Sequence, residues 1–430
     1  MTENKKVPQI RFSGFGQEWD RKQFDTAFDM ISNNTLSRDN LNYVGGSTQN
    51  VHYGDILTVF GEYVDANREI LPYLNDEEVA LKYQSATLKD GDIIFADTAE
   101  DEMAGKCIEL GNIEKKKIIS GLHTIPCRPK SKYAPKYMGY YLNSSAYHYK
   151  LFPLMQGVKV ISISKKGIRG TELVVPNEYD EQKNIGEYFY HIDEIIKQTE
   201  QKIEKIKLLK QTMLIKMFPK VDEKVPEIRF KGFSSDWEQH RLKDYQFYIS
   251  DGNYGELYPK ANEFREYGIP FIRVNNLRNG YLVHEELVFI SPELHSVLQS
   301  GHLKTDDILI TNRGQIGVIA YVDSSFNDAN INAQICLIRT ENKMYSKYLH
   351  QYLQTQECQR GINSLQTGTA LKQLPRKKLD EVVIKAPLDL KEQEKIGEYF
   401  FNLDNLFKFY QQELEKLKNM KSACMKRMFV

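Results

Sequence analysis

Two segments of the chain carry apolar residues at alternating spacings of four and three positions. The first stripe lies in residues 185–217 and the second in residues 396–428, and one lysine interrupts each, Lys210 and Lys421. This spacing is typical of the a and d positions of a coiled coil. With a rise of 1.5 Å per residue, each helix would be about 50 Å long. The stripes consist of Ile185, Phe189, Ile192, Ile196, Thr199, Ile203, Ile206, Lys210, Met213 and Met217, and of Ile396, Phe400, Leu403, Phe407, Tyr410, Leu414, Leu417, Lys421, Cys424 and Met428.

Apolar stripes of this length need a covering surface, because a helix does not leave such a face in water. We expect the two helices to pack on each other, antiparallel if a two-fold axis relates the two halves of the chain. The alternative is that each stripe covers the core of its own domain.

The chain also repeats itself at the ends of its two halves. Residues 7–15 return as residues 225–233, and residues 181–189 return as residues 392–400. The offset falls from 218 to 211 residues between these matches, so the second copy has lost residues in its interior. Matched ends with unlike interiors predict one scaffold that presents two different surfaces. A two-fold protein of this kind suits a target made of two half-sites.

Short β-branched runs bounded by turn residues predict strands between these matches. Each globular part should therefore be α+β and should end by leading into its long helix. The runs are 92–95, 173–176, 308–310, 318–321, 335–338 and 382–384.

The composition limits the class of protein. The chain has 430 residues, 41% of them hydrophobic, which is enough for roughly two or three globular units. No apolar run approaches the roughly 18 residues of a membrane span. Five cysteines without a C-x-x-C pair indicate reduced core thiols of a cytoplasmic protein. The formal net charge is zero, which counts against a protein that binds nucleic acid without a partner.

Catalytic motifs are weak in this sequence. Residues 12–16 spell F-x-G-x-G, the form of a methyltransferase cofactor loop, but no strand-forming run precedes them and the second copy has Ser234 in place of Gly16. Residues 114–116 spell the E-x-K of a nuclease motif, without a counterpart in the second copy. No histidine or cysteine cluster has the spacing of metal ligands. We therefore expect neither a catalytic centre nor a metal site.

The duplicated order of parts resembles the specificity subunit of type I restriction-modification systems. A start of the form V-P-x-I-R-F-x-G-F-x-x-x-W, a strand that ends in proline, and E-Q-x-x-I-G-x-Y-F at the head of a heptad helix all occur twice. The resemblance covers essentially the whole chain. It implies an α+β fold in which two similar α/β target recognition domains are separated by two long antiparallel coiled-coil helices and related by a pseudo-two-fold axis. The expected regions are recognition domains at 1–178 and 220–389, and spacer helices at 179–219 and 390–430.

Function and partners are also implied by the resemblance. Each recognition domain would read one half of an asymmetric bipartite target in double-stranded DNA, while the helices would set the half-site spacing and dock the methyltransferase subunits. Two modification subunits would methylate adenine with S-adenosylmethionine. Restriction subunits would translocate and cut DNA with ATP and Mg²⁺. The chain itself would hold none of these cofactors and would have no catalytic residue.

Polar side chains on loops are the candidate DNA contacts, because arginine can form paired bonds to guanine and asparagine to adenine. An equally open alternative is that these residues only cap turns. In the second domain the candidates are Asn253, Tyr254, Arg273, Asn275, Asn276, Arg278, Asn312, Arg313 and Gln315. In the first domain they are Gln49, Asn50, Thr98 and Lys159. Candidates for phosphate contacts before the last strand of each domain are Lys165, Lys166 and Arg169, and Arg376, Lys377 and Lys378.

Two functions of other classes remain open at this point. A stand-alone DNA methyltransferase or endonuclease would form a metal- or cofactor-dependent DNA product by itself. A coiled-coil adaptor that binds only proteins would show no sequence preference for DNA even with a methyltransferase partner present.

Overall fold

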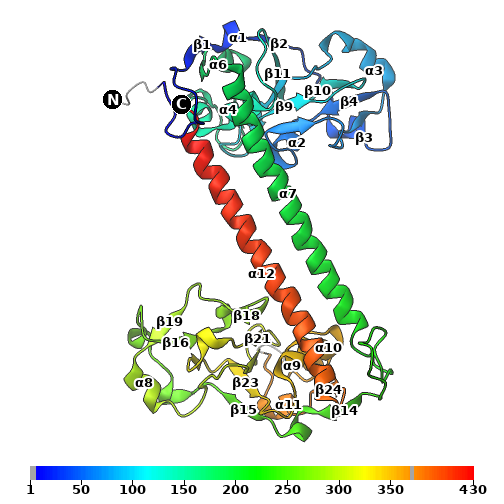
Figure 1. The fold of residues 1–430 in the computed structure, drawn as a ribbon, viewed down its shortest axis with the longest axis vertical. Helices are drawn as coiled ribbons and strands as arrows, with labels where there is room; N and C mark the ends of the chain where they lie inside the picture. The colour runs from blue at the N-terminus through cyan, green and yellow to red at the C-terminus, as the bar shows by residue number, and fades with distance from the viewer. Residues whose placement is uncertain (1–5, 369–371) are drawn as a thin grey trace. The chain divides into compact units, whose positions relative to one another are not determined.

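The computed structural model describes residues 6–368 and 372–430. The chain packs into two compact units, one formed by Met1–Gln201 with Gln412–Val430 and the other by Lys202–Gln411. The helices α7 (Tyr179–Lys216) and α12 (Leu390–Arg427), of 38 residues each, contribute one part to each unit (Figure 1). The borders of the four regions expected from the sequence remain predictions.

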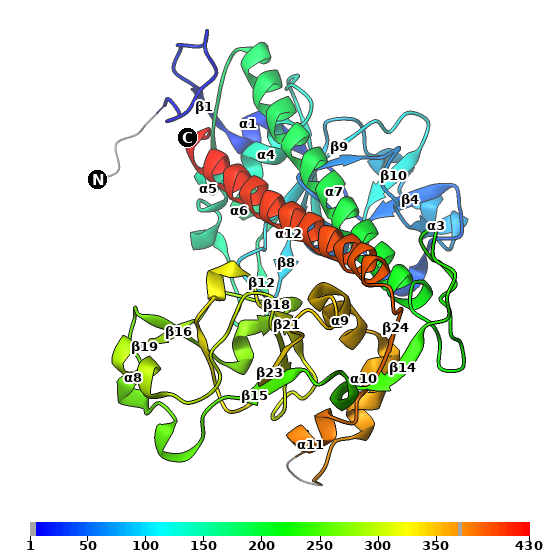
Figure 2. The same cartoon turned by 60° about the horizontal axis from the view of Figure 1, so that its bottom comes forward.

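Within each unit, the parts of α7 and α12 run antiparallel. In the first unit the rings of Phe189 and Phe429 stack at 5.6 Å. Further along α7, Glu200 accepts a bond of 2.7 Å from Lys418 of α12, which precedes Phe429 in the chain. Rising residue numbers on one helix thus meet falling numbers on the other, and Figure 2 shows α7 and α12 side by side.

Both modes of packing considered for the stripes occur. Every a and d position of the two stripes is buried or half-buried. In the second unit Phe218 near the end of α7 stacks on Phe400 of α12 at 5.8 Å, which is packing of helix on helix. In the first unit Phe189 also packs on Tyr140 of its own core, with ring centres 5.3 Å apart. The stripes therefore join the two helices and tie them to the globular cores.

A mixed sheet of the same order forms the frame of each unit. In the first unit the order is β2-β11-β7-β9-β5, and in the second it is β15-β23-β20-β21-β18, with β17 added at the edge. The pairings match one for one, since all are antiparallel except β5 with β9 and β18 with β21. The bounds are β2 (Phe28–Met30), β11 (Thr124–Pro129), β7 (Ile93–Ala96), β9 (Cys107–Gly111), β5 (Tyr63–Asp65), β15 (Tyr248–Asp251), β23 (Ile335–Arg339), β20 (Ile308–Thr311), β21 (Ile319–Tyr321), β18 (Gly280–Leu282) and β17 (Leu277–Arg278).

The second sheet differs between the units. It has four strands in the order β10-β4-β6-β3 in the first unit and three in the order β19-β16-β22 in the second, although each contains one parallel pair. The bounds are β10 (Lys117–Ser120), β4 (Thr48–Val51), β6 (Tyr73–Leu74), β3 (Leu41–Asn42), β19 (Val288–Ile290), β16 (Ile269–Ile272) and β22 (Asn330–Ile331). The expected combination of a shared frame and unlike interiors is thus confirmed at the level of the fold.

Two-stranded sheets and short helices complete each unit. The antiparallel pairs are β1 (Asp20–Gln23) with β13 (Glu172–Val175), β12 (Ile161–Ser162) with β8 (Thr98–Ala99), and β14 (Glu238–Arg241) with β24 (Val383–Ala386). The short helices are α1 (Phe24–Ala27), α2 (Tyr53–Thr58), α3 (Glu77–Lys82), α4 (Tyr137–Asn143), α5 (Ser145–His148), α6 (Lys165–Arg169), α8 (Pro292–Val297), α9 (Ser346–Leu353), α10 (Gln356–Ser364) and α11 (Arg376–Leu379).

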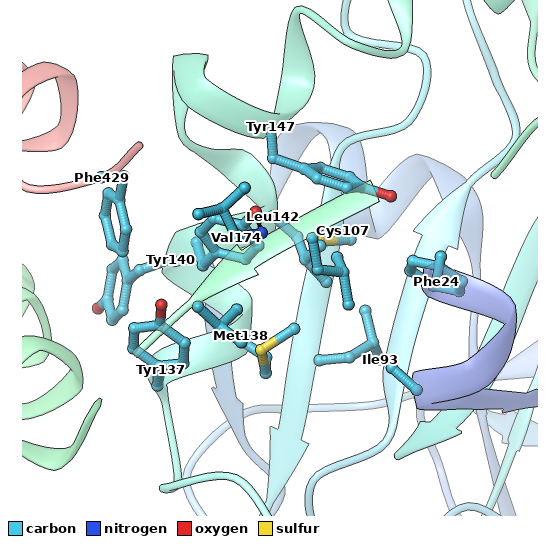
Figure 3. Packing of buried hydrophobic residues seen from close by; sticks show 14 of the residues in the cluster. Phe24, Ile93, Cys107, Tyr137, Met138, Tyr140, Leu142, Tyr147, Val174 and Phe429 are labelled. Carbon is cyan, nitrogen blue, oxygen red and sulfur yellow. Dashed lines mark hydrogen bonds between the residues drawn. The ribbon is translucent and has the colours of Figure 1, made fainter. Parts of the chain in front are cut away.

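The core of the first unit lies between its frame sheet and the long helices (Figure 3). Tyr137 and Tyr141 of α4 are fully buried and stack at 6.0 Å. Phe429, near the end of the chain, contacts Tyr137 at 6.1 Å. The cysteines Cys107 and Cys127 are free and buried in this core, where burial raises the pKa of each thiol.

The repeated sequence at each end of a unit forms a clasp. Arg11 donates two bonds, of 2.6 and 2.8 Å, to the buried carboxylate of Glu181 at the start of α7. Arg229 makes the same pair, again at 2.6 and 2.8 Å, with Glu392 at the start of α12. A bidentate pair of this kind is among the stronger hydrogen-bonded contacts in proteins. The clasp explains why the two stretches of sequence recur together.

A glycine lets each long helix approach the helix beneath it. A Cβ atom on Gly186 would lie 2.9 Å from the carbonyl oxygen of Pro135 and 2.9 Å from the amide nitrogen of Tyr137. On Gly397, a Cβ atom would lie 2.8 Å from the amide nitrogen of Tyr348. The glycine of the repeated E-Q-x-x-I-G-x-Y-F motif is therefore required by close packing against α4 and α9.

Candidate nucleic-acid interface

A short hairpin lies beside the end of one frame strand in each unit. In the first unit, Gln156 and Ser162 exchange two backbone bonds of 2.9 and 2.8 Å, and Ser162 pairs with Thr98 of β8. In the second unit, Thr367 and Gln373 exchange two backbone bonds of 2.9 Å. Gln373 in turn bridges to Arg313, which follows β20. The positions correspond at offsets of 211 and 215 residues, so the hairpin belongs to the repeated frame.

We name this region of each unit the hairpin face. It consists of Thr98 with residues 156–162 in the first unit, and of Arg313 with residues 367–368 and 372–373 in the second; residues 369–371 lie outside the described part of the chain. On the first hairpin Val158 is 98% exposed, and Lys159 is exposed beside it. Exposed apolar and cationic side chains on a tight loop are suited to contacts with bases and phosphates.

In the second unit, an aromatic ring accompanies the cation of the hairpin face. The guanidinium of Arg313 lies over the ring of Tyr254, 5.4 Å from its centre. The Tyr254 hydroxyl donates to the carbonyl oxygen of Ala333 at 2.9 Å, and 45% of the residue remains exposed. Burial and the carboxylate of Asp251 raise the pKa of Tyr254, so its hydroxyl stays neutral at physiological pH. The pair offers a flat, positively charged surface.

The polar residues in segment 273–278 form hydrogen bonds within the protein. The guanidinium of Arg273 donates to the carbonyl oxygen of Glu286 at 2.7 Å, and the amide of Asn275 donates to the Glu286 carboxylate at 2.8 Å. Asn276 is fully buried, where its oxygen accepts the Arg273 backbone N–H at 3.0 Å. Arg278 is exposed and donates to the carbonyl oxygen of Asn275 at 3.1 Å. Asn276 is thus held as a turn-forming residue, whereas Arg278 reaches the surface.

Other candidates of the second unit also divide by burial. Asn312 is buried and donates to the sulfur of Cys336 at 3.1 Å. Asn253 is buried and donates to the carbonyl oxygen of Ser300 at 2.7 Å. Gln315 is exposed, three positions after the buried Asn312. The buried amides of Asn312 and Asn253 therefore stabilise the loops that carry the exposed side chains.

In the first unit, Gln49 and Asn50 lie on β4 and are buried. The side-chain oxygen of Asn50 accepts a bond of 2.7 Å from the amide of Asn34. Gln49 donates to the carbonyl oxygen of Leu71 at 3.4 Å. These two amides therefore belong to the interior of the second sheet. The exposed candidate of this unit is the hairpin with Lys159.

The two basic groups lie on short helices in equivalent places, α6 before β13 and α11 before β24. Lys165 donates to the side-chain oxygen of Asn33 at 3.1 Å, and Arg169 pairs with Asp25 at 2.6 Å. The remaining four basic residues are exposed. They are Lys166, Arg376, Lys377 and Lys378.

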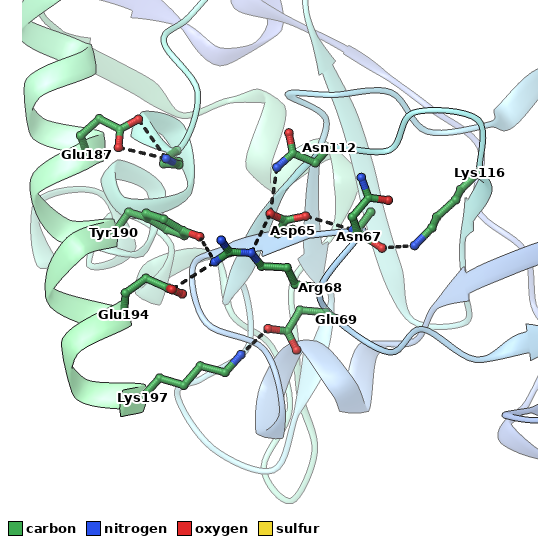
Figure 4. A network of polar contacts seen from close by, with 12 residues as sticks. Asp65, Asn67, Arg68, Glu69, Asn112, Lys116, Glu187, Tyr190, Glu194 and Lys197 are labelled. Atoms are coloured by element: carbon green, nitrogen blue, oxygen red, sulfur yellow. Dashed lines mark hydrogen bonds and ion pairs between the residues drawn. The ribbon is translucent and has the colours of Figure 1, made fainter. Parts of the chain in front are cut away.

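The residues of the weak catalytic motifs have structural partners. Lys116 of the E-x-K stretch donates to the carbonyl oxygen of Ala66, inside the polar network shown in Figure 4. In the F-x-G-x-G stretch, Gly14 has φ of 97°, and its equivalent Gly232 has φ of 98°. Because both copies turn in the same way, the glycine serves the entry of the chain into the unit. Phe12 packs edge-on against Tyr188 at 5.8 Å.

Sequence reasoning missed most of the hairpin face, since it singled out only Lys159 and the strand-end residues Thr98 and Arg313. A signal was present, because Gly157 recurs as Gly368 at the offset of 211 residues. It also missed the proximity of His295, His302 and Asp328, which the fold brings together from distant positions.

Comparisons with known proteins agree with the duplicated architecture. Residues 234–419 match the family described as the type I restriction modification DNA specificity domain. The chain is similar to the putative type I restriction enzyme MjaX specificity subunit of Methanocaldococcus jannaschii, with 22% identity over 95% of this chain and 92% of that protein. It is also similar to the MjaVIII specificity subunit of the same organism, with 23% identity over 63% of this chain and 64% of that protein.

The fold is that of a solved relative. The crystal structure of a type I restriction-modification system S subunit from M. genitalium matches with a TM-score of 0.62 and 16% identity, over 99% of both chains. Within residues 6–368 and 372–430, no helix is both long and apolar enough to cross a membrane. By these comparisons, residues 234–419 match a type I restriction modification DNA specificity domain, and the chain is similar along most of its length to type I restriction specificity subunits.

Proposed function

We propose that this chain is the DNA-recognition subunit of a type I restriction-modification complex. Each unit reads one half of an asymmetric bipartite target in double-stranded DNA. The observation that carries the proposal is the hairpin face, which stands at the same place in both repeats with unlike side chains. Thr98 occupies in the first unit the position that Arg313 occupies in the second. The two units share one frame but expose different side chains at this face, which suits the recognition of two different half-sites.

Chemistry on DNA belongs, in this proposal, to partner subunits. Two modification subunits methylate adenine with S-adenosylmethionine, and restriction subunits translocate and cut DNA with ATP and Mg²⁺. The chain itself acts without a catalytic residue. The structural roles of Lys116 and Gly14 support this assignment, because each serves the fold rather than an open site.

We assign base contacts to exposed side chains and phosphate contacts to the basic helices. Arg313, backed by the ring of Tyr254, contacts bases of one half-site, and Lys159 contacts the other. Lys377 and Lys378 of α11 contact phosphates and position the second unit. A lost bidentate base contact costs about 1–3 kcal/mol and relaxes one position of the target. A lost phosphate contact weakens all sequences alike and lowers the salt slope by about one.

Selection from a random pool of duplex oligonucleotides, with the full chain and its methyltransferase partner, tests the proposal. We expect a bipartite consensus. Arg313→Ala should relax one position of one half-site, and Lys159→Ala should affect only the other half. Lys377→Ala is the matched control and should leave the consensus intact. A pool without enrichment would exclude DNA recognition, and a DNA product formed by the chain alone with S-adenosylmethionine and Mg²⁺ would favour a stand-alone enzyme.

The long helices are proposed to set the gap between half-sites. Seven residues restore the a/d repeat, so an insertion of seven residues in both α7 and α12, after Gln201 and after Gln412, keeps both stripes in phase. It adds roughly 10 Å to each helix. The preferred gap should then grow by up to about three base pairs of 3.4 Å, with both half-sites unchanged. Methylation of targets with graded gaps measures the shift, and an unchanged optimum would assign the spacing to another part of the complex.

A further inference from the structure

Three side chains of the second unit meet although the sequence separates them widely. His295 lies in α8, His302 follows that helix, and Asp328 precedes β22. Each offers one ligand atom, a ring nitrogen or a carboxylate oxygen, and these atoms lie within 4.8 Å of one another. Nε2 of His295 is 3.4 Å from Oδ2 of Asp328. The two imidazole rings are 4.6 Å apart and nearly perpendicular, at 72°.

Each histidine has one ring nitrogen bonded to an oxygen of the protein. Nε2 of His302 bonds to the carbonyl oxygen of Leu298 at 2.9 Å, so this nitrogen carries the proton and Nδ1 carries the lone pair. Nδ1 of His295 bonds to the side-chain oxygen of Asn330, which leaves the lone pair on Nε2. A ring N–H donated to a carbonyl-type oxygen is the arrangement that orients metal-binding histidines in proteins.

In these tautomers, Nε2 of His295 and the Asp328 carboxylate are two acceptors that face each other, an arrangement that a cation between them would stabilise. We propose that His295, His302 and Asp328 form a binding site for a divalent transition-metal ion of the zinc type. Two imidazole nitrogens and one carboxylate oxygen are a ligand set that zinc accepts, with a fourth position for water. Imidazole ligands favour zinc over the magnesium or calcium ions that oxygen ligands select.

The place of the site in the fold indicates a structural role. Asp328 precedes β22, and Asn330 is the first residue of that strand and pairs with Phe271 of the parallel strand β16. An ion at this point would fasten α8 to the three-stranded sheet β19-β16-β22. β16 ends directly before Arg273, so the bound metal would also steady the polar segment 273–278.

Metal titration of the full chain, purified without a polyhistidine tag and stripped with a chelator, tests the site. We expect about one Zn²⁺ per chain, and visible absorption of bound Co²⁺ typical of a low-coordinate site. Zinc should also raise the unfolding midpoint of the second unit, reported by Trp237 fluorescence in a Trp19→Phe background.

Asp328→Asn is the sharpest variant. The side chain is 64% exposed and the residue has φ of 67°, a conformation that asparagine also tolerates, so folding should be preserved. Affinity for Zn²⁺ should fall roughly 10–100-fold or more, as it does when metal sites lose even an outer partner. His302→Gln should have the same effect. His240→Gln is the matched control, because His240 pairs with Glu238 on the surface of the same unit.

The outcomes separate the metal site from an ordinary ion pair. Retention of zinc by His240→Gln, with loss in the other two variants, supports the site. Absence of zinc from the unaltered chain would overturn it and would place a proton between His295 and Asp328 instead. Equal zinc binding by the unaltered chain and by both ligand variants would overturn it as well.

Discussion

The two lysines that interrupt the apolar stripes are paired with carboxylates, and removing one of them is a decisive test of the helix packing. In the first unit, Nζ of Lys421 lies 2.7 Å from Oδ1 of Asp193 and 2.8 Å from Oε2 of Glu62. In the second unit, Nζ of Lys210 lies 2.6 Å from Oδ1 of Asp404. The equivalent lysine thus meets the equivalent aspartate in both repeats. These pairs fix the register of α7 against α12 within each unit.

Lys421→Met keeps the apolar stem and removes the ammonium group from between two carboxylates. Removing one partner of a buried ion pair costs about 3–5 kcal/mol, because a charge remains in the interior. Side chains in this cluster are 18–28% exposed, so water screens part of the loss. We expect about 2–4 kcal/mol. Burial and the neighbouring Glu62 raise the pKa of Asp193, which agrees with a carboxylate that is costly to keep charged.

The equivalent change in the second unit should cost less. After Lys210→Met, Asp404 still accepts the hydroxyl of Tyr281 at 2.9 Å and the amide of Gln351 at 3.0 Å. After Lys421→Met, Asp193 keeps the hydroxyl of Tyr140, but the carboxylate of Glu62 also loses its cation. Neutral donors stabilise a buried carboxylate only in part.

Tryptophan fluorescence separates the two units, because the chain has two tryptophans and each unit buries one. In a Trp237→Phe background, Trp19 reports urea unfolding of the first unit. Lys418→Ala is the matched control on the same helix, since Lys418 pairs with Glu200 in the open and such pairs contribute about 0–1 kcal/mol. If Lys421→Met and Lys418→Ala lower the free energy of unfolding equally, the buried-pair argument is wrong.

The remaining predictions concern pH and close packing. Burial and Lys210 lower the pKa of His350 to about 4, so the contribution of its neutral form to stability is complete above the unfolded pKa near 6.5 and is lost as the pH falls through 4. Between pH 7 and pH 5, the free energy of unfolding should therefore fall by about 2 kcal/mol more in the native chain than in His350→Gln. Gly186→Ala should destabilise the first unit by about 1–3 kcal/mol, because the added methyl group meets backbone atoms. Gly361→Ala, on an open face of α10, should instead stabilise the second unit by about 0.5–1 kcal/mol. Urea unfolding measures both variants, and a change of the free energy of unfolding with the same sign in both would refute the packing argument.

Most of the frame was predictable because the same pattern of strands and helices occurs in both halves of the sequence. The runs 308–310 and 335–338 are β20 and β23 to within one residue, and the stripes are α7 and α12. Heptad spacing and β-branched runs are local signals, and the structure confirms them. The sequence did not reveal that Lys210 and Lys421 would meet aspartates, since that depends on the register of the two helices.

The candidate contacts were less predictable because burial decides the role of a polar side chain. Asn276 and Arg278 stand two positions apart in one polar stretch, yet the first is buried in a turn and the second is exposed. Asn312 and Arg313 differ in the same way, although they are adjacent. Local sequence carries no measure of which side of a loop faces the core. The pairing of Arg313 with the hairpin across about 60 residues is equally invisible to local reasoning.

The formal charge of zero has a different meaning once the ion pairs are placed. Many cations are matched inside the protein: Arg11 and Arg229 clasp the long helices, and Lys421 neutralises two carboxylates. Among the described residues, no ion pair within 4 Å involves Lys159 or Arg313, nor any of Lys166, Arg376, Lys377 and Lys378. These free cations lie on the hairpin face and on the helices α6 and α11. A chain without net charge can still present cationic surfaces to phosphates, because basic residues gather locally, as on α6 and α11.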